Sequence, residues 1–123
     1  MTSTPESDSS GMDILIPDEV ASSTGPVAVF GSARPNEGME AELRDILLSF
    51  VEPSRADPAS NFYQPHSDAS QPGVFIFYEN WSSGRALLAH LGEPFMAALT
   101  SRTDLLADLQ INFLTPIEPD TAN

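Results

Sequence analysis

The sequence predicts an α+β fold, a four-stranded antiparallel sheet with its helices on one side. The first observation is the order of segments along the 123 residues. Strand-like and helix-like runs follow as strand, helix, strand, strand, helix, strand, which is the split βαβ, ferredoxin-like order. The second is Val74–Trp81, which leads directly into a helix-like run and has large apolar side chains on both faces. Helices on one side cover one face, so we expect a homodimer whose second copy covers the other.

The first predicted strand is Val27–Ala33, a β-branched and apolar run that ends at Arg34-Pro35. Asn36 suits a helix N-cap, and Pro53 is expected to end the helix that follows. Between them, apolar residues recur at the spacing of one helix face. These residues are Met39, Leu43, Ile46, Leu47 and Phe50.

The second predicted strand, Asn61–His66, contains Pro65, which has no N–H for a ladder and therefore places this strand at an edge of the sheet. The turn Ser67–Gly73 joins it to the central strand. Ser82 or Ser83 then caps a helix that ends near Gly92. A further helix begins at Pro94, a turn capped by Thr103 follows, and the last strand is Leu109–Leu114.

The composition excludes several classes of chemistry. The chain has no cysteine, so disulfides, thiolate metal sites and cysteine nucleophiles are ruled out. Its five basic residues are all arginine, which rules out a Schiff-base or P-loop lysine. The net charge of −13 opposes binding to nucleic acid or to an anionic membrane surface. We expect no cofactor and no metal.

Both ends of the chain are polar. Met1–Pro26 is acidic and rich in Ser, Thr and Pro, so we expect a disordered tail there, followed by a folded domain at 27–117 and a short tail at 118–123. An alternative is that its apolar patch Met12–Pro17 docks on a sheet edge or on the domain's own cavity. The segment lacks the basic start and apolar centre of a secretory signal, so a cytoplasmic protein is expected.

The order and spacing of short motifs across residues 27–114 resemble the antibiotic biosynthesis monooxygenase (ABM) domain, including the YgiN-like quinol monooxygenases. Two positions depart from the pattern: Phe95 stands where the family has a second histidine, and Ser60-Asn61-Phe62 replaces a Cys-Leu-Arg piece. The matching motifs are Arg34-Pro35, Leu43-Arg44, Leu47-Leu48, Val51, Arg55-Ala56-Asp57-Pro58, Tyr63, His66, Asp68, Pro72-Gly73, Phe75, Phe77-Tyr78-Glu79, Trp81, Ala86-Leu87, His90-Leu91 and Pro94.

The resemblance implies a dimer whose two sheets meet in an α+β barrel. It also implies cofactor-independent oxidation of a quinol-like or polyketide aromatic by molecular oxygen. Two alternatives stay open. The chain is a non-catalytic dimeric domain that binds a small molecule or assists another protein, or it is a polyketide isomerase or cyclase. Fold alone does not decide among them.

Two histidines are candidate catalytic residues. His90 lies near a predicted helix C-terminus, where a structural role is common, but in a pocket it would accept a phenol proton. His66 lies in a turn region, where a histidine is usually only exposed. His66 and Asp68 suggest a metal pair, but the histidines and acids have no recognisable ligand spacing, so no metal site is predicted.

The candidate substrate-binding residues are mostly aromatic. On strands such side chains usually pack in the core; as pocket walls they would stack on an aromatic substrate. Arg34 is a candidate anchor for a substrate oxyanion or a partner for Glu79, which we expect at the dimer interface. The candidates are Arg34, Tyr63, Phe77, Trp81 and Phe95.

Overall fold

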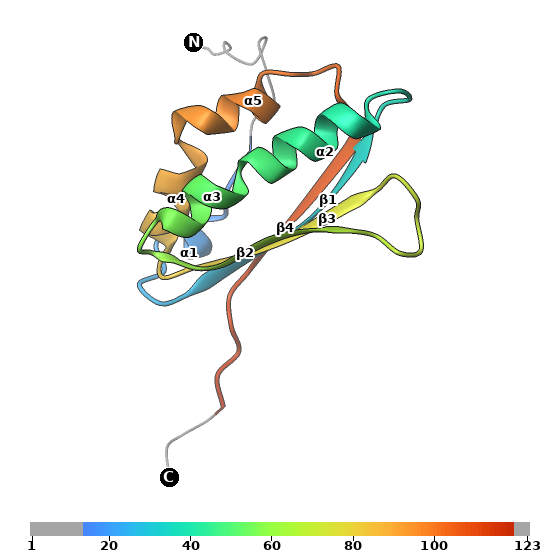
Figure 1. Cartoon of the computed structure of the whole chain (residues 1–123). Coiled ribbons are helices and arrows are strands. Elements are labelled where there is room, and N and C mark those ends of the chain that lie inside the picture. Colours follow the sequence, from blue (N-terminus) through green and yellow to red (C-terminus); the bar gives the residue numbers. More distant parts are fainter. Residues whose placement is uncertain (1–13, 120–123) are drawn as a thin grey trace, which may run out of the picture.

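The computed structural model describes residues 14–119 and consists of one sheet with helices against it (Figure 1). The strands are β1 (Val27–Pro35), β2 (Ser60–Ser67), β3 (Phe75–Trp81) and β4 (Leu106–Leu114). The helices are α1 (Asp18–Ala21), α2 (Glu40–Ser49), α3 (Val51–Ala56), α4 (Gly84–Leu91) and α5 (Ala97–Thr100), with the 3-10 helix η2 (Pro94–Met96) before α5.

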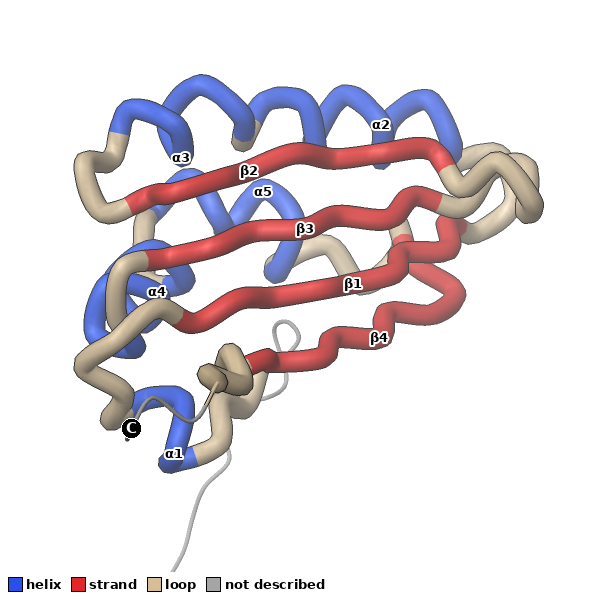
Figure 2. The backbone as a smooth tube through the Cα atoms, turned by 90° about the horizontal axis from the view of Figure 1, so that it is seen from below, coloured by secondary structure: helices blue, strands red, loops and turns tan. Residues whose placement is uncertain are grey.

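The sheet has the strand order β2-β3-β1-β4 with every pair antiparallel. This confirms the predicted ferredoxin-like α+β fold. The edge position predicted for the strand with Pro65 is also confirmed, because β2 pairs only with β3 among the described strands. Figure 2 looks onto the face of the sheet that lies away from α2, α3, α4 and α5.

Burial alternates along β3 and separates the two faces of the sheet. Phe75, Phe77, Glu79 and Trp81 are buried beneath the helices, whereas the residues between them are only half-buried. We call these the inner face and the outer face. The outer face carries apolar side chains that remain partly exposed. They include Phe30, Phe62, Ile76, Tyr78 and Leu114.

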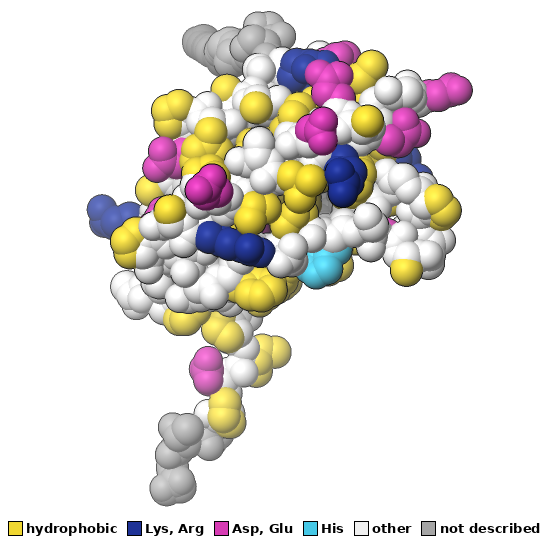
Figure 3. Space-filling model, in the orientation of Figure 1, with side chains coloured by type: hydrophobic (Ala, Val, Ile, Leu, Met, Phe, Trp, Pro, Cys, Tyr) yellow, Lys and Arg dark blue, Asp and Glu magenta, His cyan; other side chains and the backbone are white. Residues whose placement is uncertain are grey.

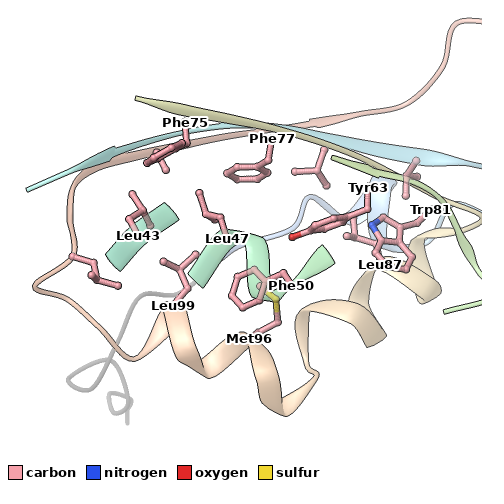
Figure 4. Packing of buried hydrophobic residues seen from close by; sticks show 14 of the residues in the cluster. Leu43, Leu47, Phe50, Tyr63, Phe75, Phe77, Trp81, Leu87, Met96 and Leu99 are labelled. Carbon is pink, nitrogen blue, oxygen red and sulfur yellow. The ribbon is translucent and has the colours of Figure 1, made fainter. Parts of the chain in front are cut away.

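The core lies between the inner face and the helices (Figure 4). The predicted apolar face of α2 is confirmed, since Leu43, Leu47 and Phe50 are buried against the sheet. Trp81 and Leu87 are fully buried at the other end of this layer. The core therefore brings α4 against the end of β3, the strand that precedes it, and this places the side chains of the candidate site.

Two local predictions around α2 are wrong. Asn36 does not cap the helix, because its side-chain amide donates to the carbonyls of Asp104 and Leu106, and α2 begins only at Glu40. Pro53 does not end the helical region either. It lies in the first turn of α3. Backbone N–H groups in the first turn have no acceptor within their own helix, so the N–H that proline lacks costs α3 no hydrogen bond.

The segment after α5 also differs from the prediction. Thr103 caps no helical turn, because residues 101–105 form turns and β4 begins at Leu106, earlier than predicted. Arg102 holds this connection by ion pairs to Asp104 and to Glu42 on α2.

The N-terminal segment was predicted to be disordered through Pro26, but its described part packs on the domain. α1 buries Val20, which is only 3% exposed. Ile16 packs against the core as well. A few apolar residues that face the domain provide this contact. The prediction of disorder relied on the average composition of the segment, which is acidic and polar, and the average does not reveal these residues. Residues 1–13, which make up half of the predicted tail and include part of the Met12–Pro17 patch, lie outside the described residues.

Candidate functional site

A small cavity lies between the inner face of the sheet and the helices. Its volume is about 30 Å³, which is room on the scale of a water molecule and not of an aromatic ring. Almost all of its walls are apolar, as expected for a site that excludes water. The lining residues are Ile14, Val29, Leu47, Phe50, Tyr63, Phe77, Glu79, Leu91, Met96, Leu99, Leu109, Ile111 and Phe113.

The polar side chains of this lining are those of Tyr63 and Glu79, and both are buried. Figure 4 shows the Tyr63 hydroxyl pointing into the space between Phe77 and Phe50. Tyr63 and Glu79 face each other in register across β2 and β3. The sheet thus places a phenol and a carboxyl group side by side at the wall of an apolar cavity.

Burial dominates the chemistry of Glu79. Removal from water disfavours the carboxylate and raises its pKa from 4.5 to about 7, although a hydrogen bond from Trp81 opposes this shift. That bond runs from the indole Nε1–H to the Glu79 Oε1 over 2.9 Å. A carboxyl group with a pKa near neutrality can take up and release a proton under ordinary conditions.

His90 lies directly behind Glu79. It is 1% exposed, and its Nε2 is 3.6 Å from the Glu79 Oε1. This nitrogen has no hydrogen-bond partner among the described residues. Burial lowers the pKa of His90 to about 4, and the negative charge of Asp57 opposes the shift. The imidazole is therefore neutral at pH 7, and its Nε2 lies just beyond hydrogen-bond distance of the Glu79 carboxyl group.

Three aromatic rings hold the imidazole of His90 in place. The rings of Trp81 and His90 are stacked at a tilt, with centroids 4.4 Å apart. Tyr63 and Phe95 meet the imidazole edge-on, with centroids 5.7 Å and 5.9 Å away. These contacts fix the side on which His90 can approach Glu79.

The phenol of Tyr63 is held in its neutral form. Burial raises its pKa well above the usual value, and the neighbouring charge of Glu79 raises it further. The hydroxyl therefore keeps its proton at any working pH and is a hydrogen-bond donor inside the cavity. It suits the stabilisation of an oxyanion that develops on a bound substrate.

The structure brings together some of the residues predicted for the site. Tyr63 and Phe77 line the cavity. Trp81 and His90 lie behind Glu79, and Phe95 packs between His90 and Phe50.

Two predicted residues lie elsewhere. Arg34 is exposed on the outer face, where it donates to the Gln71 side chain. His66 is exposed on β2 and borders a surface hollow with Arg44 and Phe75. Neither lines the cavity.

Sequence reasoning missed Glu79 as a site residue. We expected it to pair with an arginine at a dimer interface, but the structure buries it on the inner face with Trp81. The alternation along β3 places Glu79 and Trp81 on one face, and this pattern in the sequence could have identified Glu79 as a site residue. Ile14 belongs to the Met12–Pro17 patch, for which docking on the domain's own cavity was the alternative expectation, and it does line the cavity.

Comparison with known proteins assigns the family. The sequence profile of the antibiotic biosynthesis monooxygenase family matches residues 26–100, which include Tyr63, Glu79 and His90. The chain belongs to this family. The resemblance found in the sequence is therefore confirmed, and the family match covers the cavity except for Ile14 and the residues of β4.

Several solved structures have the same fold. PA3566 from Pseudomonas aeruginosa is 25% identical with a TM-score of 0.70, over 76% of this chain and 96% of that chain. Rv0793 from Mycobacterium tuberculosis is 25% identical with a TM-score of 0.69, over 79% of this chain and 100% of that chain. A candidate antibiotic biosynthesis monooxygenase from Deinococcus radiodurans is 26% identical with a TM-score of 0.68, over 79% and 98%.

A curated relative is the uncharacterised protein sll1783 of Synechocystis, which is 28% identical over 91 residues. The match covers 73% of this chain and 62% of that protein, so the chain spans about three fifths of its relative's length. None of the described helices is long and apolar enough to cross a membrane.

Proposed function

We propose that this chain is a cofactor-independent monooxygenase that oxidises a quinol-like or polyketide aromatic with molecular oxygen. The observation that supports this most directly is the cavity, in which an otherwise apolar wall presents one carboxyl group and one phenol. The family match is consistent with it. Such a site provides a base, a hydrogen-bond donor and a dry environment, which are the elements this reaction needs from a protein.

The proposed chemistry begins with the Glu79 carboxylate, which removes a proton from a phenolic hydroxyl of the substrate. The resulting phenolate is electron-rich enough to reduce molecular oxygen. One oxygen atom is inserted into a ring carbon–hydrogen bond and the other leaves as water, so that a hydroquinone becomes a hydroxyquinone. The four electrons that reduce oxygen all come from the substrate. The Tyr63 hydroxyl donates to the oxyanion that forms during this sequence.

His90 has a different role from the one predicted. It does not line the cavity, so it does not touch the substrate in this arrangement. Its unpaired Nε2 faces Glu79, and the proposal makes it the group that accepts the proton from Glu79 and restores the carboxylate. Because the pKa of His90, about 4, lies below that of Glu79, about 7, the transfer is uphill, and the carboxylate–imidazolium pair that it creates exists only transiently.

The proposed assembly is a homodimer joined through the outer face. Phe30 and Phe62 there are 43% and 47% exposed, and the Phe62 ring packs on Tyr78 at 5.6 Å. Aromatic side chains at this exposure are typical of the centre of an interface between subunits. In the space-filling view of Figure 3, charged side chains spread over the helix side of the molecule.

Oxygen uptake tests the activity. Metal-free protein is supplied with hydroquinones, naphthalenediols and anthrones, and the spontaneous oxidation of each substrate is subtracted. Glu79→Gln keeps an acceptor for the Trp81 indole but removes the base, so turnover should fall by roughly 10²–10⁴-fold. Wild-type turnover should rise as the pH passes about 7, where the Glu79 carboxylate forms.

Matched histidine variants test the proton path. His90→Phe keeps a stacked ring but no nitrogen, and it should lower turnover, whereas His66→Ala on the exposed outer face should not. No uptake above background with any substrate would contradict the proposed activity. Binding of the same aromatics without turnover, detected by quenching of the fluorescence of Trp81, the single tryptophan, would then favour a non-catalytic binding domain.

A further inference from the structure

The N-terminal segment is fitted closely to the domain through α1. A Cβ atom on Gly84 would lie 1.9 Å from the Val20 carbonyl oxygen, so only glycine at position 84 permits this approach. The Gly84 N–H also donates to the Ser23 carbonyl over 2.9 Å. Val20 itself is 3% exposed. The first residue of α4 is therefore suited to hold α1, and α1 determines where the preceding residues run.

Residues 14–17 then extend along the helix side of the sheet, away from α1 (Figure 1). Their side chains alternate. Ile14 lines the cavity and Ile16 packs against the core, whereas Leu15 between them is 84% exposed. Two isoleucines facing the domain and one leucine facing water show a segment that lies on the surface as an extended strip.

Ile14 differs from the other residues of the cavity wall in how it is held. Val29 and Leu47 belong to β1 and α2 and are each 4% exposed, so moving them would disrupt the core. Ile14 is only half-buried, and it precedes a short helix on an extended strip. Segments with few buried contacts open at lower free energy than the core. Displacement of this strip is therefore the least costly way to enlarge the cavity.

We propose that Ile14 determines which ligands the cavity accepts, and that residues 14–17 form a cover, anchored by α1, that must shift before an aromatic ring binds. The cavity of about 30 Å³ cannot hold such a ring with Ile14 in place. The ligand class is a planar, uncharged aromatic alcohol, because the walls are apolar and the two polar groups suit one hydroxyl. The inference rests on the proposed function in taking this cavity as the aromatic site.

The test measures binding of naphthol to the full-length protein by calorimetry under anaerobic conditions. Ile14→Ala removes a large side chain from the cavity wall and should tighten binding by roughly tenfold, because less of the affinity is lost to moving the cover. Leu15→Ala is the matched control on the same strip and should bind as the wild type does. Equal affinities of wild type, Ile14→Ala and Leu15→Ala would overturn the proposal, as would the absence of naphthol binding to every variant.

A glycine pair tests the anchor of the cover independently. Gly84→Ala should displace α1 and tighten naphthol binding, since its Cβ would collide with backbone atoms of Val20 and Ala21. Gly92→Ala is the control, because a Cβ there meets nothing nearer than 3.6 Å. Thermal melting establishes that both variants are folded. Identical binding by folded Gly84→Ala and Gly92→Ala would contradict the role of α1 as the anchor.

Binding and turnover separate this inference from the proposed activity. Tighter naphthol binding by Ile14→Ala, with no oxygen uptake by any variant, would support the cover and contradict the monooxygenase. Oxygen uptake by the wild type, with naphthol affinity unaffected by Ile14→Ala, would support the monooxygenase and overturn the cover.

Discussion

The two faces of the sheet are built from the same strands but meet different surroundings. On β3, Trp81 of the inner face is fully buried, whereas Tyr78 of the outer face is only half-buried. The inner face combines a packed core with one buried carboxyl group whose pKa is raised to about 7. The outer face combines half-exposed aromatic rings with polar side chains such as Gln64 and Asn112. The inner face thus has the features of a reaction site and the outer face those of an interface.

The comparison also explains why the two histidines differ. His90 reaches the inner face from α4 and is neutral because burial lowers its pKa to about 4. His66 points from β2 to the outer face and is exposed. The two histidines therefore differ in burial and in their possible roles, because they lie on opposite faces of the sheet.

The largest expected effect is on the inner face. Trp81→Ala should lower the free energy of unfolding by about 3–5 kcal/mol, because it removes a fully buried ring and leaves a cavity. Tyr78→Ala on the outer face should cost markedly less in the isolated chain. Chemical denaturation of both variants measures the difference. Equal losses would show that the outer face is buried as deeply as the inner one, which a tight dimer would explain.

The next effect is the pH dependence of stability that Glu79 imposes. Its pKa is about 7 in the folded chain against 4.5 when unfolded, so the folded state holds a proton that the unfolded state has released. This contribution to stability is complete below pH 4.5 and is lost as the pH rises to about 7. The Glu79→Gln variant has no such loss. Its free energy of unfolding should therefore exceed that of the wild type by an amount that grows to the order of 1–3 kcal/mol at pH 8.

Denaturation of the wild type and Glu79→Gln at pH 5 and pH 8 measures this advantage. His90 provides an internal check on the sign. Its pKa is lowered to about 4, so it destabilises the fold only as the pH falls below about 6.5. A Glu79→Gln variant that loses stability on going from pH 5 to pH 8 as steeply as the wild type would show that Glu79 is not buried as described.

The smallest expected effect on the stability of the chain comes from the outer face. Phe62→Ser removes a ring that is 47% exposed, so the monomer should lose less than about 1 kcal/mol. The same change should weaken the proposed dimer, since buried aromatic residues dominate such interfaces. Sedimentation equilibrium of wild type and variant at micromolar concentration decides this, and a monomeric wild type would contradict the homodimer.

The sequence alone determined the order of the elements and the alternation along each strand. These features depend on local geometry: apolar spacing along α2 and Pro65 at the edge strand each express a constraint among near neighbours. That is why the fold was predicted correctly, while Asn36 and Pro53, whose roles depend on distant acceptors or on helix register, were not.

Only the tertiary structure decided the composition of the site. The sequence placed Glu79 and Trp81 on one face, but which face the helices cover depends on how the whole chain packs. His90 meets Glu79 because α4 folds back over the end of β3. Ile14 reaches the same cavity from the N-terminal end of the described chain because Gly84 lets α1 approach closely. Such contacts join residues far apart in the chain, so no local pattern encodes them, and burial then determines the pKa values on which the proposed chemistry depends.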